Sequence, residues 1–140
     1  MAQLIEEIMN PNPTIYPATT PLDEAARAMR DTGIGDVLVE DDGALCGIVT
    51  DRDIVVRAVA EDRQPSRSRL GDICSRQLVS LAPDDTVADA VQMMRDNALR
   101  RLPICAPDGT PIGIVSLGDL AVEQDPMSAL ADISAVPPNN

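Results

Sequence analysis

An internal duplication constrains the fold of this chain more than any other feature of its sequence. A shift of 65 residues places Ala25, Met29, Arg30 and Asp31 on Ala90, Met94, Arg95 and Asp96. After one inserted residue, a shift of 66 places Asp42, Gly43, Gly47, Ile48, Val49 and Asp53 on Asp108, Gly109, Gly113, Ile114, Val115 and Asp119. Ten identities in two clusters indicate two copies of one structural unit.

Each copy has the same predicted order of elements. A short helix (2–8 and 70–74) precedes a brief strand (14–16 and 78–80) and a longer amphipathic helix. Thr20 and Thr86 should begin those longer helices, with Asp23 and Asp89 completing capping boxes, and Gly33 should end the first. Two apolar strands then flank an Asp-Gly turn, typical of a hairpin (37–39 and 45–50 in the first copy), and a last helix follows.

The predicted fold is therefore α+β, with two β-α-β-β-α repeats. A unit of about 60 residues would leave apolar surface in water if it stood alone. We expect the two repeats to pack face to face with pseudo-twofold symmetry, which would create two equivalent clefts. The expected boundaries are 1–64 and 65–124, with a polar linker at 61–68 and a frayed C-terminal tail at 125–140.

Composition excludes several functions. The 140 residues include no His and no Phe or Trp, and all 11 basic residues are Arg. This excludes serine-histidine and cysteine-histidine catalysis, His-containing zinc sites and lysine chemistry. The net charge of -12 opposes binding to nucleic acid or anionic membranes, and no apolar run approaches the ~20 residues of a membrane span. The N-terminus does not resemble a signal peptide, so we expect a cytoplasmic protein. We also expect no metal site.

Three cysteines, Cys46, Cys74 and Cys105, form no CxxC pair. We interpret them as small buried side chains in a reducing compartment. A redox role would require an exposed thiol of low pKa, which the sequence does not reveal.

The motif with most chemical content is the run from Gly47 to Asp53, repeated from Gly113 to Asp119. In both copies an apolar strand passes through a hydroxyl residue, Thr50 or Ser116, into a helix that carries an Asp in its first turn. A helix N-terminus and a hydroxyl can bind phosphate, and the Asp can accept hydrogen bonds from ribose hydroxyls. The same spacing is also that of a plain capping box, and the spacing alone does not decide between these readings.

The paired Gly-Ile-Val strands with their S/T-x-x-D ends, together with the stretch 99–104, resemble the cystathionine-β-synthase (CBS) domain family. Its members occur as tandem pairs called Bateman modules. The layout is similar to small stand-alone CBS-pair proteins of the actinobacterial hypoxic-response type. The resemblance implies that Asp53 and Asp119 bind ribose, that Thr50 and Ser116 lie near phosphate, and that Arg100 and Arg101 contact phosphate.

The two copies differ in charge. Gly35 and Asp36 stand where Arg100 and Arg101 stand in the second copy, and Arg52 is replaced by Gly118. We therefore expect one cleft to bind an anion while the other stays empty. The resemblance places adenine among aliphatic residues, namely Ile15, Ile48, Val79 and Ile114.

These features predict a non-enzymatic regulatory module without catalytic residues or a required cofactor. Its ligand would be adenosyl in character: AMP, ADP, ATP, NAD or S-adenosylmethionine. Arg52 and Ile114 complete the expected ligand-binding set of Thr50, Asp53, Arg100, Arg101, Ser116 and Asp119. The resemblance further implies a homodimer, and the output would pass through an unidentified protein partner. The alternative is a ligand-free structural or stress-related interaction module in which the motifs only cap helices; enzyme activity is a third reading, which no carboxylate spacing supports.

Overall fold

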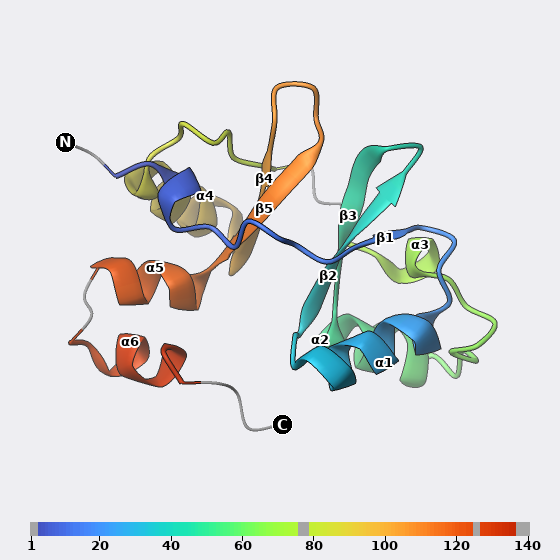
Figure 1. Ribbon diagram of the computed structural model, residues 1–140. Coiled ribbons are helices and arrows are strands. Elements are labelled where there is room, and N and C mark those ends of the chain that lie inside the picture. Colours follow the sequence, from blue (N-terminus) through green and yellow to red (C-terminus); the bar gives the residue numbers. More distant parts are fainter. Residues whose placement is uncertain (1–2, 76–78, 125–126, 137–140) are drawn as a thin grey trace. The chain divides into compact units, whose positions relative to one another are not determined.

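A computed structural model describes residues 3–75, 79–124 and 127–136 of the chain (Figure 1). The chain divides into two compact units. One, the first-repeat unit, comprises Thr14–Leu78, and the other, the second-repeat unit, comprises Met1–Pro13 together with Val79–Asn140. Each unit contains helices and a strand hairpin, so the predicted α+β class is confirmed.

The first-repeat unit is built on a three-stranded sheet in the order β1-β2-β3. Strand β1 (Ile15–Pro17) runs parallel to β2 (Asp36–Asp41), which pairs antiparallel with β3 (Ala44–Thr50). Asp42 and Gly43 both have positive φ, as a tight hairpin turn requires, which confirms the predicted hairpin. The helices of this unit are α1 (Leu22–Thr32), α2 (Asp51–Ile54), a π-helical turn η2 (Val55–Val59) and α3 (Leu70–Ile73).

The second-repeat unit contains the hairpin of β4 (Arg101–Cys105) and β5 (Pro111–Ser116). Its helices are the 3₁₀ turn η1 (Ile5–Glu7), α4 (Val87–Asn97), α5 (Leu117–Gln124) and α6 (Ala129–Ser134). The predicted strand at 78–80 is wrong for residues 79 and 80, and Leu78 lies outside the described residues. Pairing starts instead at the buried Leu81, which forms a single parallel bridge with Ile104.

The short helix that precedes each repeat in the sequence packs in the unit of the other repeat. Within the second-repeat unit, the Ile5 amide donates to the Asp85 carbonyl at 2.7 Å, and Asn10 bridges to Ile114 of β5. Within the first-repeat unit, the amide of Leu70 donates to Thr20 at 2.9 Å, and Ser75 bridges to Ile48 of β3. The compact units therefore differ in composition from the sequence repeats, because these two segments are exchanged.

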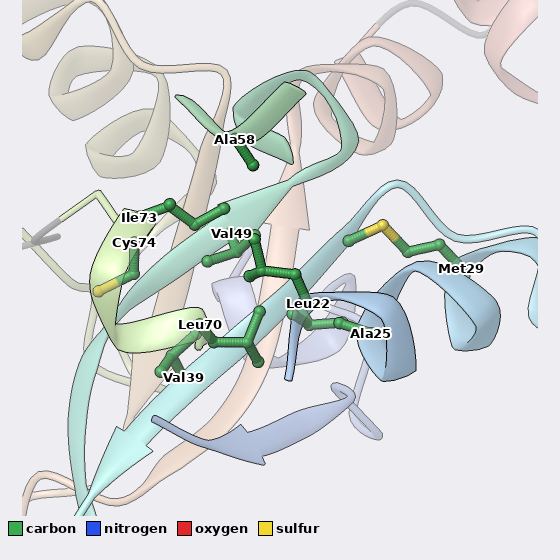
Figure 2. Close-up of a cluster of buried hydrophobic side chains, with 10 residues drawn as sticks. Leu22, Ala25, Met29, Val39, Val49, Ala58, Leu70, Ile73 and Cys74 are labelled. Carbon is green, nitrogen blue, oxygen red and sulfur yellow. The ribbon is translucent and has the colours of Figure 1, made fainter. Parts of the chain in front are cut away.

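Each unit has its own apolar core. In the first-repeat unit, side chains from α1, β2, β3 and α3 converge, and Figure 2 shows Leu70, Ile73 and Cys74 of the exchanged segment among them. In the second-repeat unit, the exchanged Ile5 is completely buried and belongs to a core with these other members: Leu81, Val87, Ala90, Met94, Leu102, Ile104, Val115 and Leu120. An exchanged segment thus supplies part of each core.

The two long helices begin differently. Thr86 caps α4 as predicted: its hydroxyl accepts from the Asp89 amide, and Asp89 accepts from the Thr86 amide at 2.9 Å. That backbone hydrogen bond lowers the pKa of the Asp89 carboxyl. The capping box predicted at Thr20 is wrong, because α1 starts after Pro21 and Thr20 is buried. The linker caps α1 instead, since the carbonyl of Ser68 accepts from the Leu22 amide at 3.0 Å.

Two chain segments complete this description. Gly33 ends α1 in the left-handed conformation, as predicted. In the tail predicted to fray, helix α6 lies against α5 within the second-repeat unit. Residues 125–126 and the Pro-Pro-Asn-Asn end at 137–140 lie outside the described residues, so the prediction stays untested there. Among the residues that the structure describes, no helix is long and apolar enough to span a membrane.

Candidate functional site

In the first-repeat unit, the Thr50 and Asp53 side chains close the start of α2. The Thr50 amide donates to Asp53 Oδ2 at 2.9 Å, and the Asp53 amide donates to Thr50 Oγ1 at 3.0 Å. The Asp53 side chain is 14% exposed, and its Oδ1 lies 3.7 Å from Nε of Arg57. Both carboxylate oxygens therefore already have partners within the protein.

The other amides of this turn are also engaged. The Asp51 amide donates to the Gly35 carbonyl at 3.0 Å, and the Arg52 amide donates to Oδ1 of Asp51 at 2.8 Å. Together with the amides of Thr50 and Asp53, these bonds satisfy the four successive N–H groups at the start of α2. A phosphate would have to displace one of them to bind there.

In the second-repeat unit, Ser116 and Asp119 form the equivalent turn at the start of α5. The Ser116 amide donates to Asp119 Oδ2 at 2.8 Å, and the Asp119 amide donates to Ser116 Oγ at 3.2 Å. Asp119 is exposed, in contrast to Asp53. Leu117 stands where Asp51 stands in the first repeat, so the Gly118 amide has no equivalent of the Asp51 carboxylate beside it.

Strand register determines which charge lies beside each hydroxyl. Arg101 is directly opposite Ser116 across β4 and β5, whereas Asp36 is directly opposite Thr50 across β2 and β3. Opposed residues in antiparallel strands have their Cβ atoms about 4.5–5.5 Å apart, on the same face. The structure thus brings a cation to the second motif and an anion to the first.

Arg57 is a site residue that the sequence analysis missed. Besides its contact with Asp53, it donates through Nη1 to the Ile73 carbonyl at 3.2 Å. Its spacing of four residues from Asp53 on a helix was the available signal. Glu123 stands at the equivalent position of the second repeat, four residues after Asp119. Arg57 therefore offsets the negative charge of Asp53, whereas Glu123 cannot do the same for Asp119.

The remaining predicted site residues are placed as follows. Arg52 and Arg100 are exposed, and the Arg100 carbonyl accepts from the Leu117 amide at 2.8 Å. Ile114 is 8% exposed, and its backbone exchanges hydrogen bonds with Asn10. The structure therefore groups Arg100, Arg101, Ser116 and Asp119 in one unit, and Thr50, Arg52 and Asp53 in the other.

Helix α6 approaches the start of α5 closely. A Cβ atom added to Gly118 would lie 2.9 Å from Ser134 Oγ, so a larger residue would crowd α6. Ser134 thus borders the turn that holds Ser116 and Asp119. Its contribution could not be predicted, because the tail carries no motif.

Two further surfaces bear on function. An apolar groove of about 400 Å³ runs between α4 and α5, lined by Val91, Met94, Arg95, Leu99, Leu117, Leu120, Ala121 and Gln124. In the first-repeat unit, Val55, Val56 and Val59 of η2 are between 42% and 62% exposed. Within the described ranges, no cluster of three or more His, Cys, Asp or Glu side chains could hold a metal ion.

Comparison with known proteins identifies the family. The model of the CBS domain matches residues 5–59 and again residues 70–124, so the chain belongs to the CBS domain family and carries two copies of the domain. CBS-domain pairs are generally regulatory modules. The resemblance suggested by the paired motifs is confirmed.

Individual relatives cover most of the chain. The CBS domain-containing protein YhcV of Bacillus subtilis is 39% identical over 125 residues, covering 86% of this chain and 87% of YhcV. A crystal structure of Hypoxic Response Protein I with two coordinated zinc ions superposes with a TM-score of 0.76 at 26% identity, covering 86% and 98% of the two chains. The CBS domain pair of protein MJ0100, in complex with 5-methylthioadenosine and S-adenosyl-L-methionine, reaches a TM-score of 0.80 at 21% identity, covering 91% and 100%.

Proposed function

We propose that this protein is a non-enzymatic sensor that binds a phosphate-bearing adenosyl ligand at the second motif. The observation that carries the proposal is the register that sets Arg101 opposite Ser116, beside the exposed Asp119. An arginine beside a helix start favours an anion, and Arg100 precedes it in the chain. The complex of MJ0100 with 5-methylthioadenosine and S-adenosyl-L-methionine supports the adenosyl part of this ligand class, although neither compound carries phosphate.

The residues have distinct roles in this proposal. Arg100 and Arg101 bind phosphate, Ser116 donates its hydroxyl proton to it, and the Gly118 amide adds a backbone donor. Asp119 uses Oδ2 to cap α5, so Oδ1 accepts from a ribose hydroxyl. The first motif is the weaker candidate for two reasons. Its Arg52 amide is bonded by the Asp51 carboxylate and its Asp53 Oδ1 lies beside Arg57, whereas Leu117 and Glu123 replace Asp51 and Arg57 in the second motif. Asp36 would also repel phosphate.

Thermal unfolding in the presence of AMP, ADP, ATP or NAD tests the proposal, with S-adenosylmethionine as an adenosyl compound that lacks phosphate. A ligand present at 100 times its Kd stabilises the folded state by about 2.7 kcal/mol, which raises Tm by several degrees. We expect Arg101→Ala and Asp119→Ala each to lose most of that rise. Arg67→Ala removes the same charge at an exposed position and should keep it.

The same Tm measurements also distinguish the proposed sensor from a ligand-free interaction module. Unchanged Tm with all five compounds at millimolar concentration would contradict ligand sensing and favour an interaction module whose motifs only cap helices. A ligand-induced rise that is lost in Asp53→Asn but kept in Asp119→Ala would instead assign binding to the first motif. The Tm of each variant without ligand reports its loss of helix capping separately.

We further propose that the protein is a homodimer that buries its apolar helix surfaces. The α4-α5 groove and the exposed Val55, Val56 and Val59 are apolar surfaces of a kind that association covers. Hexameric CBS-CP12 protein from bloom-forming cyanobacteria shows that a protein with this fold assembles. Sedimentation equilibrium should give twice the chain mass of 14.9 kDa. Val59→Glu should shift the mass toward one chain, and a monomeric wild type would refute the dimer.

A further inference from the structure

Two cysteines of the first-repeat unit lie side by side although 28 residues separate them in the sequence. The Sγ atoms of Cys46 and Cys74 are 3.6 Å apart, and both residues are thiols. Cys46 belongs to β3. Cys74, labelled in Figure 2, directly follows α3, the exchanged segment. The adjacent backbone bridge between Ile48 and Ser75 holds the two segments together.

The two thiols differ in access to solvent. Cys46 is half-buried, whereas Cys74 is 7% exposed and belongs to the apolar core. A small reagent therefore reaches Cys46 first. Cys74 is the second thiol, which reacts with Cys46 once Cys46 has been modified. Cys105 lies in the other unit, and burial raises the pKa of its thiol, which lowers the fraction of Cys105 present as the reactive thiolate.

We propose that Cys46 and Cys74 form a reversible disulfide that links β3 to the segment after α3. The Cys46 thiolate attacks a small-molecule disulfide, which forms a mixed disulfide and releases one thiolate. The Cys74 thiolate then attacks the Cys46 sulfur, forms the protein disulfide and expels the second thiolate. Two protein thiols lose two protons and two electrons, and the external disulfide takes them up to become two thiols.

The pair is also connected to the first motif. Ile73, which precedes Cys74, accepts the hydrogen bond from Arg57, and Arg57 lies beside the Asp53 carboxylate. Forming the bond requires the Cys74 and Cys46 sulfurs to approach from 3.6 Å to about 2.05 Å. We expect part of this approach to shift the backbone at Ile73, the residue before Cys74 that holds Arg57. Oxidation thus acts on the start of α2 through Ile73 and Arg57. This coupling does not depend on the proposed ligand at the second motif.

Oxidised glutathione followed by peptide mapping tests the disulfide. Trypsin places the three cysteines in separate peptides, 31–52, 70–76 and 102–140. We expect the first two to appear as one linked species that reductant separates, and the protein to lose two hydrogens in mass. Cys105→Ser should keep this link, whereas Cys46→Ser and Cys46→Ala should each abolish it. Oxidised Cys105→Ser protein should also unfold several degrees higher than its reduced form, because the link restricts the unfolded chain.

Other outcomes overturn the proposal. A glutathione adduct that persists on Cys46 without closing onto Cys74 would show that the second attack does not occur. A link that includes Cys105 would show that pairing is unspecific. Amide hydrogen exchange of residues 50–57 tests the coupling: we expect different rates in oxidised and reduced protein, and equal rates would refute the path through Arg57.

Discussion

Replacing Leu70 by Ala should lower the free energy of unfolding by about 2–5 kcal/mol, because the side chain is completely buried and its loss leaves a cavity. Ile5→Ala should cost a similar amount for the same reason. The two variants should differ in which of the two units becomes locally less stable. Ile5 lies in the core of the second-repeat unit, and Leu70 lies in the core of the first.

Hydrogen exchange measured strand by strand resolves this. Ile5→Ala should accelerate exchange mainly in β4 and β5, and Leu70→Ala mainly in β2 and β3. Glu6→Ala and Arg69→Ala change exposed neighbours in the same two segments and should leave the exchange rates near those of the wild type. If Ile5→Ala loosened β2 and β3 instead, the exchange of segments between repeats would be refuted.

The sequence predicted those parts of the fold that depend on local patterns. The Asp-Gly turns, the end of α1 at Gly33 and the cap of α4 at Thr86 are determined by residues within one turn of the feature. The motif turns at Thr50 and Ser116 follow the same local pattern, a hydroxyl with an Asp three residues later. Thr20 and Asp23 have this spacing as well and form no cap, so the pattern alone is not sufficient.

The features that were missed all depend on distant segments. Thr20 does not cap α1, because the carbonyl of Ser68 does so from the linker. The exchange of η1 and α3 leaves no local trace, since the apolar pattern of a short helix says nothing about which sheet it covers. The tail was expected to be frayed because its end is rich in Pro and Asn, and the packing of α6 on α5 could not be read from composition.

For the candidate site, the sequence predicted the residues and their charge asymmetry but not their alignment. That Gly35 and Asp36 correspond to Arg100 and Arg101 was visible in the repeat. Only the register shows that Arg101 faces Ser116 and that Asp36 faces Thr50. Arg57 was visible as a helical neighbour of Asp53, yet its second contact, with Ile73, again comes from an exchanged segment.

A second large effect is expected at Gly47. A Cβ atom there would overlap the Ser75 carbonyl oxygen and would lie 3.3 Å from the Cys74 sulfur. The Ser75 backbone is held by two hydrogen bonds with Ile48, so moving it away from the new Cβ would weaken or break those bonds. Gly47→Ala should therefore lower the free energy of unfolding by about 2–3 kcal/mol, measured by denaturant titration.

Gly113 provides the matched comparison in the other repeat. A Cβ there would meet the Met9 side chain and would lie 3.0 Å from the Asn10 carbonyl oxygen. The Met9 thioether can rotate away, so Gly113→Ala should cost about 1 kcal/mol, less than Gly47→Ala. Both glycines lie where a strand accepts an exchanged segment at close range. Equal and negligible costs at the two positions would mean that neither segment is held as tightly as these contacts require.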